Sequence, residues 1–299
     1  MYKLINSLSK LGWRRIAFSV IVLTYLGFLL FINLLMVMPG NFISAMGHFS
    51  FINTGDTHNL VHELVFAIIV GMTAVGLFSQ LRKPENFAGQ LIALIAWVAI
   101  IATGMITNNL VPHPLLIIFG GLTLLATILH PSGLGLFSWI CTAKVNKILI
   151  ALTIIVAVPL TVFAFTNINL QIAGDSGFPH NPPAFHGDII FNQEINQYQP
   201  LNNSDNIVTN KVDHEHAEQG HYRNMAAFSF IIVLMSILTS LKPKGRRLIA
   251  WSTGLLSLSL GLISVILLDA ESSLGLFWGL AAIFWGIVFV AAAEITDNC

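Results

Sequence analysis

Long apolar runs separated by short polar segments dominate the pattern of this chain. A membrane-spanning helix needs about 20 largely apolar residues to cross about 30 Å of hydrocarbon. Eight runs meet this requirement, at approximately 16–38, 59–80, 88–108, 114–130, 147–166, 225–241, 248–268 and 274–294. The pattern therefore predicts about eight transmembrane helices, with both termini on the same side of the membrane.

The overall composition agrees with this prediction. Hydrophobic residues make up 55% of the chain and charged residues 9%, with a mean hydropathy of +0.78, far from the values of soluble domains. We expect an all-α integral membrane protein in a lipid bilayer. The sequence has no phosphate-binding glycine loop and no outer basic patch, which excludes nucleotide-binding and nucleic-acid-binding proteins. Protein partners are not indicated.

The basic residues predict the orientation. Twelve of the 14 lysines and arginines fall on the side of the N-terminus, and only Lys211 and Arg223 fall opposite. Because cytoplasmic segments carry the excess of Lys and Arg, both termini should be cytoplasmic and residues 167–224 should form a long extracytoplasmic loop. The polar composition of this loop predicts a cap over the bundle. Cys141 and Cys299 then lie in the cytoplasm, where no disulfide is expected.

Two segments of the chain resemble each other. Residues 62–84 and 221–243 each begin with a histidine, continue as an apolar span and end at a proline 22 positions later. The tetrapeptide Leu-Ile-Ala-Trp follows at 94–97 and again, after a shorter inner loop, at 248–251. This similarity predicts an internal repeat.

The repeat divides the chain into two four-helix units, 1–143 and 144–299, the second containing the 167–224 loop. Four spans return a chain to its starting side, so the two units have the same orientation. A pseudo-symmetry axis would then run along the membrane normal. It would bring the second helices of the two units, and the histidines at their outer ends, close together.

Nine of the ten histidines fall in the predicted extracytoplasmic segments. His58 and His62 are four residues apart, a spacing that places two side chains on one face of a helix. Neutral imidazoles so placed can bind one transition metal. The pattern is not that of a zinc protease, because Glu63 follows the second histidine and does not lie between the two.

The second cluster lies at residues 213–222. If this segment is helical, His214, Glu218 and His221 fall on one face at i, i+4 and i+7. Di-iron bundles normally need two Glu-x-x-His elements, and this chain has one, so a mononuclear Cu, Zn or Fe site fits better. The predicted metal ligands are His58, His62, His113, His214, Glu218 and His221. His180 and His186, in the outer loop, would cover or complete the site.

Simpler interpretations exist for several of these residues. Histidines at the water-facing ends of helices can be solvated, with Asp56 and Asp213 favouring the helix N-termini. We assign no site role to His48, or to His130, which we expect to end a cytoplasmic helix before Pro131.

Other features indicate packing. Gly275 and Gly279 have the spacing that allows close approach of helices. Trp278 and Trp285 are expected to pack in the bundle or to face lipid.

Three functional classes remain open. The first is a membrane enzyme with an extracytoplasmic metal, and the second is a haem-carrying electron-transfer protein with His62 and His221 as axial ligands. The third is a proton-coupled transporter or sensor whose outer histidines titrate without metal. The spans hold almost no charge at mid-membrane depth, which argues against transport. The sequence thus predicts an outer histidine-rich metal or redox site, and leaves substrate and reaction unassigned.

Overall fold

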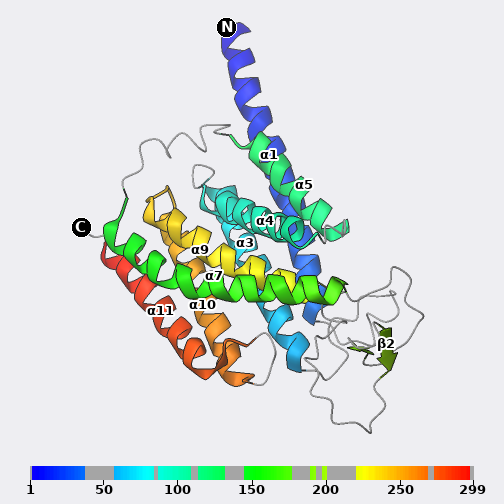
Figure 1. Cartoon of the computed structure of the whole chain (residues 1–299). Coiled ribbons are helices and arrows are strands. Elements are labelled where there is room, and N and C mark those ends of the chain that lie inside the picture. The colour runs from blue at the N-terminus through cyan, green and yellow to red at the C-terminus, as the bar shows by residue number, and fades with distance from the viewer. Residues whose placement is uncertain are drawn as a thin grey trace.

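The computed structural model describes most of the helical part of the chain (Figure 1). The described residues are 2–37, 57–83, 87–108, 114–131, 145–176, 189–192, 197–200, 220–268 and 273–296. Their helices are α1 (Tyr2–Val37), α3 (Thr57–Arg82), α4 (Ala88–Ile106), α5 (Pro114–Leu129), α7 (Lys147–Ser176), α9 (His221–Ser240), α10 (Arg246–Ile266) and α11 (Gly275–Ile295). Each predicted apolar run therefore contains a helix.

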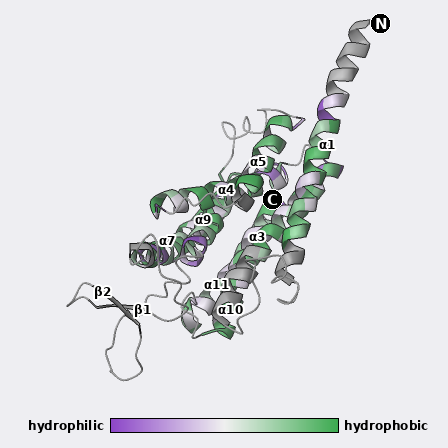
Figure 2. Cartoon of the chain, turned by 90° about the vertical axis from the view of Figure 1, so that its right-hand side faces the viewer, coloured by the Kyte–Doolittle hydropathy of each residue, from purple (hydrophilic) through white to green (hydrophobic). Residues whose placement is uncertain are grey.

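Six of these helices are long and apolar enough to cross a membrane, namely α1, α4, α7, α9, α10 and α11. Apolar stretches in α3 and α5 are shorter, at Ala67–Arg82 and Ile117–Leu129. Figure 2 shows that apolar residues predominate along the helices of the bundle, and Ile155 and Val158 of α7 are 64% and 65% exposed. Six helices of spanning length with such apolar outer surfaces make the chain a polytopic integral membrane protein.

The long loop begins later than the sequence predicts. Its expected start at residue 167 is wrong, because α7 continues to Ser176. Asn167 and Gln171 are buried in this added part of α7, and the Gln171 side-chain oxygen accepts a hydrogen bond from the backbone N–H of Arg223, at 3.1 Å. Gln171, taken for a loop residue, therefore helps to hold α7 against the start of α9.

A short β-hairpin lies within the predicted loop. Strand β1 (Ile189–Asn192) pairs antiparallel with β2 (Gln197–Pro200), with Ile190 opposite Gln199. The apolar residues of this segment therefore form a strand, an element that the sequence analysis did not anticipate.

The same helix pairs pack in the two halves of the chain. In the first half, α3 packs against α1 and α4, and α5 packs against α1 and α4. In the second half, α9 packs against α7 and α10, and α11 packs against α7 and α10. Between the halves, α3 and α4 contact α9 and α10.

The connections from α3 to α4 and from α9 to α10 differ from the sequence prediction. Residues 83–87 join α3 to α4 and residues 241–245 join α9 to α10, so the second connection is equal in length to the first and not shorter. The Leu-Ile-Ala-Trp segments at 94–97 and 248–251 consequently do not occupy equivalent positions. The first lies about one helical turn deeper in its helix than the second.

Glycines allow close approach of neighbouring helices. A Cβ at Gly76 of α3 would lie 2.5 Å from Cα of Gly89 of α4, so only glycine fits there. In α10 and α11, Gly254 faces Gly286, and Gly261 faces Gly279. Contacts of this kind replace the hydrophobic effect as a source of helix association in lipid.

The prediction that Gly275 and Gly279 form a packing motif is confirmed for Gly279 and wrong for Gly275. Gly279 packs against α10, whereas Gly275 has open space around its Cβ position and a φ of 71°. Gly275 is therefore needed for backbone conformation at the start of α11, since a positive φ is costly for other residues. The packing motif of α11 is Gly279 with Gly286.

The tryptophans pack as expected. Trp285 is buried, stacks on Phe289 with ring centroids 4.7 Å apart, and donates its indole N–H to the carbonyl of Leu152 in α7 at 2.9 Å. Trp278 is 52% exposed on the apolar surface. Both have packing or surface roles.

Candidate functional site

The first predicted histidine pair lies at the start of α3. This helix begins at Thr57, so His58 and His62 occupy its first two turns and are four residues apart. The prediction that one helix carries both residues is confirmed. Their side chains lie outside the described part of the structure.

The second cluster is not one continuous helix. Helix α9 begins at His221, and the preceding Gly220 has φ 71° and ψ 25°, a left-handed conformation that breaks a right-handed helix. The hypothesis of a single helical face carrying His214, Glu218 and His221 is therefore wrong. His214 and Glu218 themselves lie outside the described residues, as do His113, His180 and His186.

Three neighbours fix the position of His221. The Arg223 side chain lies against Gly220, because a Cβ at this glycine would be 2.7 Å from a terminal nitrogen of Arg223. The backbone N–H of Arg223 is bound to Gln171 of α7, and Tyr222 is fully buried. His221 is thus a half-buried residue at the junction of α7 and α9.

His130 ends α5, as expected, but it is not solvated. It follows the last residue of α5 but is fully buried. Its ring centroid lies 5.0 Å from that of Phe18 in α1 and 5.1 Å from that of Phe87, next to α4. His130 therefore helps to hold α1, α4 and α5 together at the end of α5.

Polar side chains are buried between the helices. The sequence analysis proposed no functional role for polar residues in these positions. In α9, the hydroxyls of Ser229, Ser236, Thr239 and Ser240 each donate to the carbonyl four residues earlier. Such bonds satisfy a hydroxyl inside a helix without a partner from another helix. These bonds explain why a span rich in serine and threonine can be buried. They do not indicate a ligand site.

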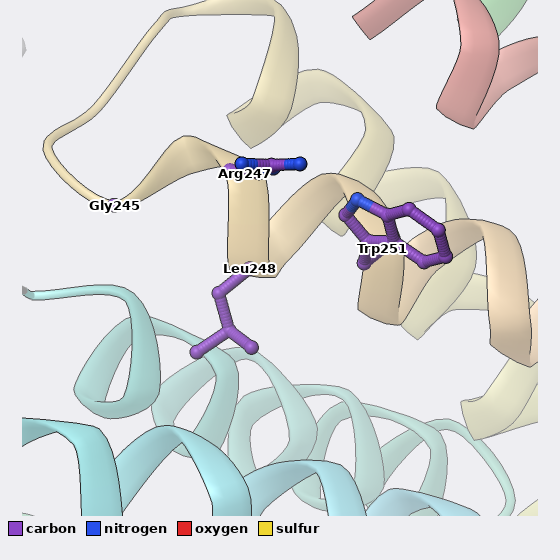
Figure 3. A pocket seen from close by; sticks show the side chains of 4 residues that line it. All are labelled: Gly245, Arg247, Leu248 and Trp251. Atoms are coloured by element: carbon purple, nitrogen blue, oxygen red, sulfur yellow. The ribbon is translucent and has the colours of Figure 1, made fainter. Parts of the chain in front are cut away.

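A cluster of charged and aromatic residues lies where α10 begins. One oxygen of Glu294 in α11 accepts from Nε of Arg247 and from the indole N–H of Trp251, both at 2.7 Å. An open groove of about 360 Å³ is lined here by Gly245, Arg247, Leu248 and Trp251 (Figure 3). Figure 3 shows the Arg247 guanidinium extending toward the Trp251 ring, with Leu248 pointing toward α3 and α4. The sequence offered one signal for it, the basic run that precedes Trp251.

Within the described residues, no group of three or more His, Cys, Asp or Glu side chains is placed to hold a metal ion. Of the six predicted ligands, the described side chains include only His221, so the metal site stays a prediction. No family model, curated protein or solved structure matches this chain.

Proposed function

We propose that this polytopic membrane protein binds a transition metal, Cu, Zn or Fe, at its outer face. The proposed ligands are drawn from His58, His62, His113, His214, Glu218 and His221. A haem held by His62 and His221 is the redox form of the same proposal. Catalysis is left open, because binding alone would account for the ligand set.

One observation carries the proposal, which is the position of histidines at the first turns of both α3 and α9. These two helices contact each other in the interface between the halves of the chain. His58 and His62 fall in the first turns of α3, and His221 is the first residue of α9. In Figure 1 both helices start on the side of the bundle where the β-hairpin lies. His62 and His221 could bind one ion if their side chains are close together. If they are further apart, a ligand from the outer loop would have to complete the site.

The left-handed Gly220 changes how the second cluster would contribute. Because the chain turns at this residue, His214 and Glu218 would approach a metal from a segment that is separate from α9. Ligands from separate segments can surround an ion more completely than two residues on one helix. This favours a closed four-ligand site of the kind that Zn²⁺ occupies, or a tetragonal copper site.

The two-unit architecture is a further part of the proposal. The units are 1–143 and 144–299, in the same orientation, with both termini in the cytoplasm. The matching helix pairs of the two halves support it, whereas the displaced Leu-Ile-Ala-Trp segments do not. Cys141 and Cys299 test the orientation, because a membrane-impermeant maleimide should leave both unlabelled in intact cells and label them after permeabilisation.

The metal proposal is tested by elemental analysis and absorption spectroscopy of the full-length protein, purified in detergent without chelators. The wild type is compared with the double variant His62→Ala/His221→Ala and with His48→Ala as a matched control. We expect about one metal ion or haem per chain in the wild type and in the control, and loss from the double variant. A Soret band would identify haem.

Two results would contradict the proposal. One is a wild type that is free of metal and colourless, which would favour the alternative of a proton-coupled transporter or sensor with titrating histidines. The other is a double variant that retains the metal while remaining folded, which would place the ligands elsewhere.

A further inference from the structure

We infer that the groove at the start of α10 binds the phosphate headgroup of an anionic phospholipid. The groove combines a partly free guanidinium, an exposed indole and a basic loop at the level where a membrane span begins. It is independent of the proposed metal site, because it lies at the opposite end of helices α9 and α10.

The geometry of the groove leaves donors available for a ligand. Arg247 is 71% exposed, and Glu294 is its one side-chain partner within the described residues. That bond uses the Nε donor, and a guanidinium carries five N–H donors in all. The terminal nitrogens therefore remain able to bind a phosphate with the two parallel bonds typical of arginine.

Glu294 fixes the two side chains that form the walls of the groove. The same carboxylate oxygen binds Arg247 and Trp251, which are four residues apart and so lie on one face of α10. A preorganised arginine loses less side-chain entropy on binding than a free one. The bond to Glu294 thus positions Arg247 without consuming its remaining donors.

The local charge favours an anion. Lys242 and Lys244 are exposed in the connection between α9 and α10, and Arg246 and Arg247 follow them. Against these four positive charges, the described residues around the groove include one negative charge, that of Glu294, which pairs with Arg247. The ion pair with Glu294 does not neutralise the positive charge around the groove. The remaining positive charge would attract a phosphate.

The membrane level of the groove identifies a lipid as the source of this phosphate. The candidate span of α10 begins at Arg246, so Arg247 and Trp251 lie in its first two turns. Tryptophan favours the headgroup region, and Trp251 is 44% exposed there. Basic residues next to a span attract anionic lipids. A lipid would place its phosphate at Arg247 and its acyl chains along the apolar surface of the bundle.

The test is native mass spectrometry of the full-length protein in detergent, titrated with dioleoyl phosphatidylglycerol or dioleoyl phosphatidylcholine. A third titration uses inorganic phosphate as competitor. We expect the wild type to retain phosphatidylglycerol in preference to phosphatidylcholine, with little displacement by inorganic phosphate. Arg247→Gln should weaken phosphatidylglycerol binding about fivefold, the effect of one basic charge near a headgroup.

Two further variants separate binding from loss of structure. Lys147→Gln removes an exposed basic charge at the first residue of α7 and should leave the affinity unchanged. Glu294→Gln removes the negative charge but keeps a side-chain oxygen that can accept from Arg247 and Trp251. It should therefore strengthen binding, whereas structural damage would weaken it. Equal binding of the two lipids, or an Arg247→Gln protein that binds as the wild type does, would overturn the inference. Displacement by inorganic phosphate at equal concentration would identify a free anion as the ligand and overturn the assignment to lipid.

Discussion

The phenol oxygen of Tyr25 in α1 lies 2.8 Å from Oγ1 of Thr123 in α5, and both side chains are fully buried. Oγ1 of Thr123 also donates to the carbonyl of Phe119 at 2.8 Å. Because a hydroxyl has a single proton, Tyr25 must be the donor and Thr123 the acceptor. The pair therefore joins two helices that are distant in the sequence.

Removing either partner of this bond should have unequal effects. Tyr25→Phe should lower the free energy of unfolding by about 1 kcal/mol, whereas Thr123→Val leaves the tyrosine hydroxyl buried without an acceptor and should cost about 2 kcal/mol. Thermal unfolding in detergent, followed by circular dichroism, measures both. Thr24→Val is the control, because Thr24 is exposed and bonds within its own helix. If the double variant lost the full sum of the two single effects, the bond would not be coupling the helices.

Adjacent glycines in α5 should respond differently to alanine. At Gly120 a Cβ would overlap the indole ring of Trp97 in α4, whereas at Gly121 there is nothing within 4 Å. Gly120→Ala should therefore destabilise the protein by about 2 kcal/mol through overpacking. Gly121→Ala should stabilise it slightly, because alanine favours the helix by about 1 kcal/mol. Their melting temperatures in detergent measure the difference, and equal effects would show that Trp97 does not pack on α5.

His130 should be needed for stability and not for metal binding. His130→Ala removes a buried ring from between Phe18 and Phe87 and should cost about 3 kcal/mol, as other large-to-small core substitutions do. Unfolding in detergent gives the stability, and elemental analysis of the same sample gives the metal content. His62→Ala should have the opposite profile, with metal lost and stability kept. A His130→Ala protein that is fully stable yet lacks metal would reverse these two roles.

The helices of this protein could be predicted from the sequence because hydrocarbon leaves the backbone few alternatives. Every peptide group in a span must form its hydrogen bonds within the chain, so an apolar run of sufficient length becomes a helix. The same reasoning failed at the end of α7. Asn167 and Gln171 look like loop residues by composition, but one bonds within its own helix and the other binds α9.

The site could be predicted in part only. The spacing of His58 and His62 predicted that both residues lie on one helix, and both lie on α3. The start of α9 could not be predicted, because the pattern of residues 213–222 did not reveal that Gly220 has a left-handed backbone conformation. The groove at Arg247 was equally hidden, since its form depends on Glu294, a residue 47 positions away.

Two buried glutamines of the first half should respond in opposite ways to leucine. Gln90 donates from Nε2 to the carbonyl of Thr123 at 2.9 Å and to Oγ1 of Thr127 at 2.6 Å. Gln80 is also fully buried, but neither its amide nitrogen nor its amide oxygen has a hydrogen-bond partner among the described residues. A buried polar group without a partner costs about 1–3 kcal/mol, so the two residues should differ in what they contribute to stability.

Gln80→Leu should therefore raise the free energy of unfolding by about 1 kcal/mol, because it replaces an unsatisfied amide by an apolar group of similar volume. Gln90→Leu should lower it by about 2 kcal/mol, since it leaves the Thr123 carbonyl and the Thr127 hydroxyl with fewer partners. Thermal unfolding of both variants in one detergent gives the comparison. If Gln80→Leu melted below the wild type while Gln90→Leu did not, the prediction would be wrong. The amide of Gln80 would then have a stabilising partner in the interface of α3 with its neighbours.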